Sequence, residues 1–218
     1  LRDIRKLKEK ERQESNLTVL VELSKNKNVV SGNYAEAMPE ILAKIAETLI
    51  ADRVSVWDCA PGKPNIKRIG ISENGTFSSE RKIIQPQVFM PCLELLMKDG
   101  VVMIDEAETH VATKNIPVSD FWPKDVKSLM QLPILVDGEI SGILSIESTK
   151  HRINWSTHDM FFTKAAIDIL IITYKSFLRI RAEKKIIQKN KLKWKWIPGH
   201  SNNIYNDLVD TLANNGIN

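Results

Sequence analysis

Residues 127–148 read Lys-Ser-Leu-Met-Gln-Leu-Pro-Ile-Leu-Val, then Asp-Gly-Glu, then Ile-Ser-Gly-Ile-Leu-Ser-Ile-Glu-Ser. Two apolar runs rich in strand-forming residues flank Asp137-Gly138, and this order predicts a β-hairpin with a two-residue turn. Pro133 has no backbone N–H to donate, so we expect it at a bulge or where the strand edge is unpaired.

A long helix is expected after the hairpin. Ser156 or Thr157 can cap it by accepting backbone hydrogen bonds in its first turn. Apolar residues recur from Phe161 onward, and the pattern extends the helix to about Lys191. A helix of roughly 35 residues is about 50 Å long, so we expect part of it to project from the domain.

Two helices are expected at the beginning of the chain. Residues 1–25 are rich in charge but keep a broken apolar stripe, which indicates a helix with a large exposed face. In residues 34–51, Ile41, Ile45 and Leu49 recur every four residues and predict a helix packed on a core.

The middle of the chain alternates between strands and turns. Residues 53–59 and 66–71 each predict a strand, and a third is expected around residues 81–84, beyond the Asn74-Gly75 turn.

A further helix is expected over residues 87–98, ended by Gly100, followed by a short strand over residues 101–104. Residues 105–124 then form a polar connection of about twenty residues, a length that is usually functional inside a compact domain.

The order strand, tight turn, strand, loop, long helix resembles the end of a GAF domain, the small-molecule sensing module of signalling proteins. Upstream, residues 37–57 are similar to the first helix and strand of that family, and residues 91–105 to its middle helix and short strand. The resemblance covers about residues 34–177. Seven residues fall where the family's pattern places such residues: Ser128, Pro133, Gly138, Gly142, Glu147, Arg152 and Trp155.

This resemblance implies an α+β fold, an α/β sandwich with a central antiparallel sheet of about five to six strands and helices on both faces. We divide the chain into four parts: an N-terminal signalling and dimerisation helix (1–30), a GAF-like domain (31–177), a basic extension of the last helix (178–195) and an irregular tail (196–218). The two terminal helices are expected to pack on one face of the sheet, leaving the other face for a ligand.

The composition is ordinary for a soluble globular protein, with 43% hydrophobic and 27% charged residues. The first residues alternate in charge without an apolar core, so no signal peptide is expected, and the most apolar stretch, residues 165–174, is too short to span a membrane. Two cysteines, Cys59 and Cys92, give no disulfide framework. These features favour the cytoplasm.

Catalytic chemistry is not indicated. The sequence has no phosphate-binding loop, and the acids and His110 of residues 105–110 match no metal-site spacing. Relatives that attach bilins, and free methionine sulfoxide reductases with a similar fold, use cysteines; Cys59 and Cys92 are better interpreted as buried packing residues. We therefore expect no enzymatic activity, no catalytic residues and no metal, and leave the cofactor unknown.

The resemblance favours a sensor that binds an unidentified small molecule and passes the signal through a homodimer of terminal helices to an effector outside this chain. The candidate ligand residues are Trp57, Asp105, His110, Phe121, Trp122, Ser128 and Met130. An alternative is a ligand-free dimerisation or scaffold module of the same fold, in which the aromatic residues fill the pocket.

The net charge of +4 is concentrated near the end of the chain. Residues 175–195 carry nine Lys or Arg against one acid, Glu183. A solvated helix face is the simplest interpretation, while binding to nucleic acid or acidic lipid stays open as an alternative without strong support.

Overall fold

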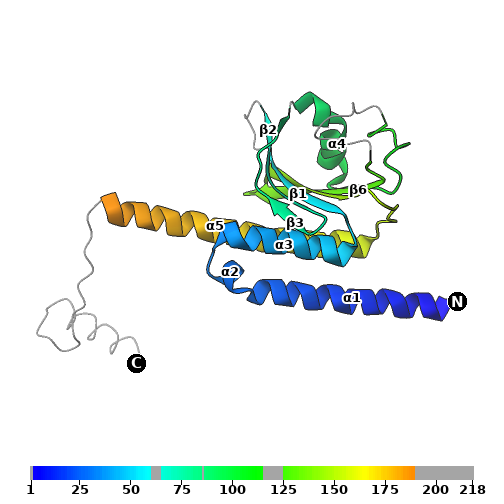
Figure 1. The fold of residues 1–218 in the computed structure, drawn as a ribbon, viewed down its shortest axis with the longest axis horizontal. Coiled ribbons are helices and arrows are strands. Elements are labelled where there is room, and N and C mark those ends of the chain that lie inside the picture. Colours follow the sequence, from blue (N-terminus) through cyan, green and yellow to red (C-terminus); the bar gives the residue numbers. More distant parts are fainter. Residues whose placement is uncertain (1, 60–64, 85, 115–124, 190–218) are drawn as a thin grey trace, which may run out of the picture. The chain divides into compact units, whose positions relative to one another are not determined.

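The computed structural model describes residues 2–59, 65–84, 86–114 and 125–189, apart from the side chains of residues 2–9, 86–92 and 189. Seven strands form one antiparallel sheet in the order β3-β2-β1-β7-β6-β5, with β4 also paired to β2 (Figure 1). The strands are β1 (Arg53–Asp58), β2 (Ile66–Glu73), β3 (Thr76–Ser78), β4 (Ile83–Ile84), β5 (Val102–Ile104), β6 (Ser128–Val136) and β7 (Glu139–Ser148).

The predicted hairpin is β6 and β7. Asp137 and Gly138 have φ values of 54° and 86°, and positive φ at both turn positions gives a twist that matches the strands on either side. Asn74 and Gly75, with φ of 48° and 79°, make the same kind of turn between β2 and β3. Both predicted turns are confirmed.

The strand expected around residues 81–84 is present as β4, and a further short strand, β3, lies between it and the Asn74-Gly75 turn. β3 begins directly after the turn at Thr76 and pairs with the end of β2, while β4 pairs with its beginning. The sequence does not predict β3, because its three residues are too few to give a periodic signal.

Pro133 lies in β6 opposite Ile143 of β7. On the other side of β6, strand β5 reaches only as far as Gln131. Within the described residues, this edge of β6 is therefore unpaired at the proline, as predicted for a residue without a backbone donor.

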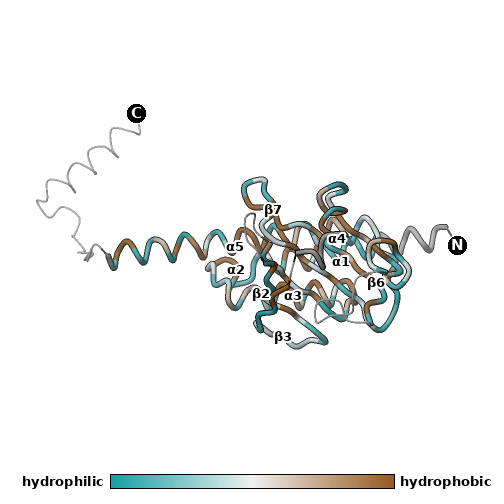
Figure 2. The backbone as a smooth tube through the Cα atoms, turned by 90° about the horizontal axis from the view of Figure 1, so that it is seen from above, coloured by the Kyte–Doolittle hydropathy of each residue, from teal (hydrophilic) through white to brown (hydrophobic). Residues whose placement is uncertain are grey.

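One face of the sheet is covered by α3 (Tyr34–Leu49) and α5 (Thr157–Lys189) (Figure 1). Ile41, Leu42 and Ile45 of α3 and Phe162 and Leu170 of α5 are buried against Val54, Val56, Met130, Leu144 and Ile146 of the sheet. Hydrophobic and hydrophilic residues alternate along α5 (Figure 2), as expected for a helix with one buried face.

The opposite face is covered by α4 (Pro86–Asp99). Leu96 of α4 packs with Trp57, Leu129 and Ile143 of the sheet in a second core cluster. The predicted arrangement, an antiparallel sheet with helices on both faces, is confirmed.

The first helix, α1 (Arg2–Lys25), lies on the same side of the sheet as α3 and α5. The single-turn α2 (Lys27–Val30) connects it to α3. Leu23 of α1 is buried in the main core. Arg12 forms an ion pair of 2.6 Å with Asp159 in the first turn of α5, and Gln13 hydrogen-bonds to His158. The predicted contact between the terminal helices is therefore present.

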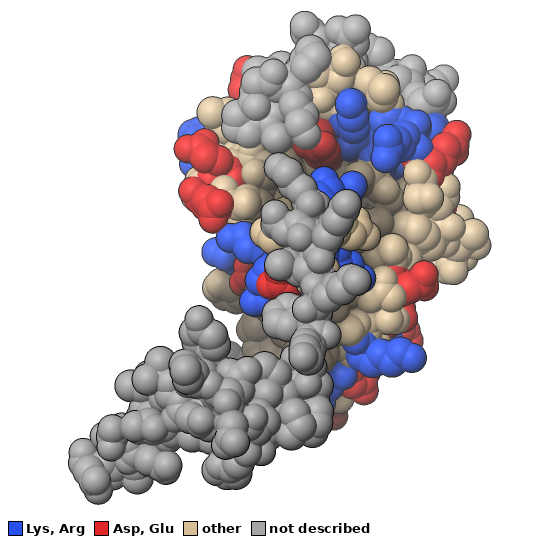
Figure 3. Space-filling view, turned by 90° about the vertical axis from the view of Figure 1, so that its left-hand side faces the viewer, with Lys and Arg blue, Asp and Glu red and all other residues tan. Residues whose placement is uncertain are grey.

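Residues 1–178 form one compact unit and residues 179–218 a second one. In the second unit, the described residues 179–189 are helical and mostly exposed. The space-filling view shows basic and acidic side chains together on one face of the described part (Figure 3), which is typical of a solvated surface. No helix among the described residues is both long and apolar enough to cross a membrane.

Candidate functional site

The side chains of β1 alternate between the two faces of the sheet. Val54 and Val56 face α3 and α5, whereas Trp57 belongs to the cluster beneath α4. Because alternate residues of a strand share a face, Arg53 and Ser55 also lie on the α4 face. Two polar residues of β1, Arg53 and Ser55, therefore lie on the face of the sheet that α4 covers.

Strand pairing extends this pattern into three rows across the α4 face. From β2 to β6, the rows are Arg68, Trp57, Ile143 and Pro133; then Ile71, Ser55, Ser145 and Gln131; then Glu73, Arg53, Glu147 and Leu129. We call five residues of the first two rows the polar floor: Ser55, Trp57, Arg68, Gln131 and Ser145. All five are less than 9% exposed.

A chain of hydrogen bonds crosses the second and third rows. Gln131 Nε2 donates to Ser145 Oγ (3.2 Å), and Ser145 Oγ donates to Glu147 Oε1 (3.0 Å). Glu147 also accepts a bond of 2.5 Å from Arg53 Nε, and Arg53 makes a further ion pair of 3.3 Å with Glu73. Burial alone would lower the pKa of Arg53, but Glu147 beside it raises that pKa above its ordinary value.

Arg68 is less completely paired. Its guanidinium carbon lies 6.0 Å from the centroid of the Trp57 ring, within the range of a cation–π contact. Nη2 donates to the backbone oxygen of Glu80 (3.3 Å), but the buried Nε has no hydrogen-bond partner among the described residues. Burial lowers the pKa of Arg68 from its ordinary value, although an arginine stays charged at neutral pH.

Gln131 is similar at the other end of the polar floor. Its Oε1 is buried and accepts no hydrogen bond within the described part of the chain. A buried polar atom without a partner costs about 1–3 kcal/mol. Toward the part of the chain that the structure describes, the polar floor therefore keeps an unused donor on Arg68 and an unused acceptor on Gln131.

The candidate ligand residues named from the sequence are distributed over several places. Trp57 lies in the polar floor, while Met130 faces the opposite way, into the core beneath α3 and α5. Phe121 and Trp122 lie outside the described residues. The roles in ligand binding that the sequence predicts for Phe121 and Trp122 stay predictions.

Asp105 and Ser128 are brought together. Ser128 Oγ donates to the backbone oxygen of Asp105 (2.8 Å) and accepts from Ile153 N (2.8 Å). Asp105 Oδ1 accepts from Trp155 N (3.0 Å). Both side chains hold the loop that leads into α5.

His110 lies in the turns after Asp105. Its Nδ1 accepts a 3.2 Å bond from the backbone N–H of Ala112, which stabilises the turn. Among the described residues, no group of three or more His, Cys, Asp or Glu is arranged to hold a metal ion.

Arg68, Gln131 and Ser145 are absent from the candidates named from the sequence. A signal for this face exists in β1, where Arg53, Ser55 and Trp57 alternate with two valines. Alternation identifies two faces but leaves open which one is covered, and the partners on β2, β6 and β7 follow only from strand pairing.

Comparison with known proteins gives a family match. The family described as "GAF domain" matches residues 33–172, more than half of the chain. A 31-residue segment is 52% identical to ribonuclease H of Orientia tsutsugamushi (strain Boryong), but it covers 14% of this chain and 18% of that protein. That match is too short to indicate the activity of this chain.

Solved structures with a similar fold have low sequence identity. The GAF domain of a phosphoenolpyruvate-protein phosphotransferase from Coxiella burnetii is 17% identical, with a TM-score of 0.56 and coverage of 79% of this chain and 98% of that one. A phycoerythrobilin-bound GAF domain from a cyanobacterial phytochrome is 18% identical, with a TM-score of 0.56 and coverage of 75% and 97%.

Free methionine-R-sulfoxide reductase from Neisseria meningitidis, solved with its substrate, is 15% identical, with a TM-score of 0.56 and coverage of 78% and 91%. At such identities these similarities concern the fold alone. The fold is therefore shared by signalling proteins and by an enzyme.

Proposed function

This chain belongs to the GAF domain family, and from that membership we propose that it is a regulatory domain that binds a small molecule over the polar floor. The observation that carries the proposal is buried Arg68 beside Trp57, with a guanidinium Nε that has no partner among the described residues. Small-molecule sites combine an apolar lining with a few placed polar groups, and the α4 face has this composition.

The unused atoms indicate the chemistry of the ligand. Arg68 offers a buried N–H to a carboxylate, phosphate or carbonyl oxygen, and the Trp57 ring offers a flat apolar surface. Gln131 Oε1 offers an acceptor to an N–H or O–H group. A small planar molecule with an acidic or carbonyl group and a hydrogen-bond donor satisfies all three.

The connection after β5 is part of this proposal. We propose that residues 105–124 form a lid over the ligand, with Phe121, Trp122 and His110 among its contacts. Asp105 and Ser128 support the lid from its base, because their hydrogen bonds join the loop after β5 to the loop after β7.

The signal would leave the domain through α1 and α5 in a homodimer, toward an effector outside this chain. Large apolar side chains are exposed on both helices: Leu17 is 63% exposed on α1, while Phe161 is 59% and Ile172 63% exposed on α5. A ligand can transmit a signal only when it binds two arrangements of these helices with different affinity.

The same exposed residues favour a second candidate function, a dimerisation module without a ligand. It differs from the first proposal in the role of the polar floor, which would then serve packing alone. Binding of a ligand distinguishes the two candidates.

We propose a binding rather than a catalytic role, although the fold also occurs in a reductase. The basis is that the chain has two cysteines, of which Cys59 is half-buried at the end of β1. A cytoplasmic location belongs to the same proposal, since two cysteines do not make the disulfide framework that is typical of small secreted domains.

The test is a thermal-unfolding screen against cyclic nucleotides, amino acids, tetrapyrroles and small organic acids. A ligand at 100 times its dissociation constant adds about 2.7 kcal/mol to the free energy of unfolding. We expect a ligand with an acidic or carbonyl group to stabilise the protein.

The variant Arg68→Met should lose this stabilisation, because it removes the guanidinium but keeps an unbranched apolar side chain. Lys67→Met, at the exposed neighbouring position of β2, is the matched control and should keep it. Equal stabilisation of both variants would contradict the role of Arg68, and no stabilisation by any compound would favour the dimerisation module.

A further inference from the structure

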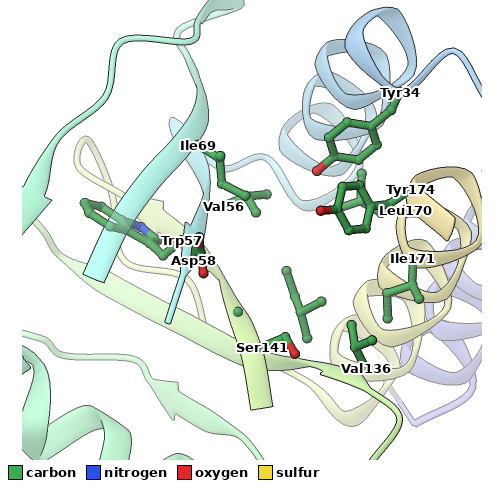
Figure 4. Close-up of a pocket in the computed structure, with 12 residues that line it drawn as sticks. Tyr34, Val56, Trp57, Asp58, Ile69, Val136, Ser141, Leu170, Ile171 and Tyr174 are labelled. Carbon is green, nitrogen blue, oxygen red and sulfur yellow. The ribbon is translucent and has the colours of Figure 1, made fainter. Parts of the chain in front are cut away.

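A cavity of about 340 Å³ lies on the other face of the sheet, between the strands and helices α3 and α5 (Figure 4). Its apolar walls come from Val56 and Ile134 of the sheet and from Leu170 and Ile171 of α5. This volume is at the small end of the range of small-molecule pockets.

Two tyrosines supply the polar groups on the helix side. Tyr34 begins α3 and Tyr174 lies in α5, with their ring centroids 5.0 Å apart. Both hydroxyls point into the cavity (Figure 4), and neither makes a hydrogen bond with another described residue. Burial, with a smaller contribution from Tyr174, raises the pKa of Tyr34 to about 12, so this hydroxyl stays protonated and able to donate.

The lining of the cavity is mostly apolar, with Asp58 and Ser141 on the sheet side. Moving a full charge from water into such a site is costly. Access from solvent is available beside Tyr174, which is 39% exposed. An occupant should therefore be apolar along its body and uncharged, with an oxygen that accepts from a tyrosine.

We propose that this cavity is a second binding site, for an uncharged, mostly apolar small molecule that carries one carbonyl or hydroxyl oxygen. The site goes beyond the proposed function, since it lies across the sheet from the polar floor and does not depend on a ligand there. Because Leu170, Ile171 and Tyr174 all belong to α5, the occupant stabilises this part of α5 against the sheet.

The experiment is an NMR titration of the full chain with 1-tetralone, a bicyclic aromatic ketone, and with tetralin, the same ring system without the oxygen. We expect 1-tetralone to shift the signals of Tyr34, Val56 and Ile171 and to leave those of Arg68 and Gln131 in place. Shifts confined to Arg68, Gln131 and their neighbours would overturn the second site without affecting the proposal for the polar floor.

The variant Ile171→Trp fills the cavity and should weaken 1-tetralone binding by about tenfold or more, since overpacking a filled site costs roughly 1–3 kcal/mol. Ile172→Trp is the matched control, because Ile172 is the next residue of α5 and is 63% exposed. Unchanged affinity in a folded Ile171→Trp protein would overturn the proposal.

A double variant, Tyr34→Phe with Tyr174→Phe, keeps the shape of the cavity. It tests the second binding site even if Ile171→Trp does not fold. It should lower the affinity for 1-tetralone by roughly fivefold, which corresponds to the loss of one neutral hydrogen bond, and leave the affinity for tetralin unchanged. An equal effect on both compounds, or no binding by either one up to its solubility limit, would overturn the proposed chemistry.

Discussion

Asp52 shows how one side chain fixes two segments that are far apart in the sequence. Its Oδ2 accepts hydrogen bonds from the backbone N–H groups of Thr149 (2.8 Å) and Lys150 (3.0 Å), and Oδ1 forms an ion pair of 3.0 Å with Lys150 Nζ. Burial alone would raise its pKa, but these contacts lower it from 3.8 to about 2. The carboxylate therefore joins the start of β1 to the end of β7 most strongly while it is ionised.

Asp52 should make stability depend on pH in acid. Its folded pKa is lower than its unfolded pKa, so the stabilisation is complete above about pH 5 and is lost as pH falls toward 2. We expect Asp52→Asn to lower the free energy of unfolding at pH 6 by about 1–2 kcal/mol and to differ little from the original protein near pH 2. Urea unfolding at both pH values measures this.

Asp137→Asn is the control for that measurement, since Asp137 pairs with Lys175 on the surface, where its side chain is 83% exposed. A surface pair contributes about 0–1 kcal/mol. An Asp52→Asn effect of the same size at pH 6 and pH 2 would contradict the assigned role of the charge.

Arg68 should lower the free energy of unfolding of the ligand-free protein, although it contributes to ligand binding. The variant Arg68→Met removes a buried cation whose Nε has no partner in the described part of the chain, and replacing such a group by an apolar one is often neutral or stabilising. We expect the ligand-free variant to unfold a few degrees higher, about 2–4 °C for each 1 kcal/mol gained, by differential scanning calorimetry. A loss of several degrees would mean that the Trp57 contact stabilises the fold.

At the scale of elements, the start of α5 is tied to α1. Ser156 Oγ accepts from Asp159 N (3.2 Å), and Asp159 Oδ2 accepts from Ser156 N (2.9 Å), a reciprocal cap of the first turn. The other oxygen of Asp159, whose side chain is fully buried, pairs with Arg12 of α1. The Asp159 carboxylate thus caps the first turn of α5 and also binds α1 through Arg12.

Arg12→Met should loosen α1 without unfolding the sheet. The variant leaves the buried Asp159 without its cation, while the cap from Ser156 remains. We expect faster amide hydrogen exchange in residues 10–25 and little change in β6 and β7, because local openings differ between parts of a structure. Lys10→Met, at an exposed position of the same helix, is the control; equal exchange in both variants would contradict the tie.

The elements differ in how far the sequence predicts them. The two positive-φ turns, the helix cap at Ser156 and the period of α3 depend on neighbouring residues, so they could be predicted. Met130 stays a predicted ligand contact, and it lies on the face toward α3 and α5. The sequence does not reveal this face, because β6 is buried on both faces from Ser128 to Leu132. The Arg68–Trp57 contact depends on the pairing of β1 with β2, which no local pattern contains.

At the scale of the whole molecule, the proposed homodimer depends on exposed apolar residues. Phe161 and Ile172 are eleven residues apart, close to three helical turns, so they lie on one side of α5. Leu17 and Val21 are one turn apart on α1. Isolated apolar residues are normal on a surface, but two such pairs on packed helices favour a dimer interface.

The double variant Phe161→Glu with Ile172→Glu should convert the dimer to a monomer. Four buried carboxylates in a symmetric interface would repel one another and lose hydration. Ile83→Glu, in β4 at another exposed apolar position of the domain, is the control because Ile83 is 62% exposed. Analytical ultracentrifugation measures the mass, and an unchanged mass for the double variant would contradict this interface.

Alternation in β1 means that the side chain of Val56 faces the cavity and the side chain of Trp57 the polar floor, although both residues line the cavity and are neighbours in the chain. The two proposed sites therefore share a wall that is one strand thick. If occupancy on one side moves this wall, it changes the space on the other. By thermodynamic reciprocity each occupant must then change the affinity of the other by the same factor. The output of the domain would then depend on the concentrations of two compounds together, rather than on the concentration of one.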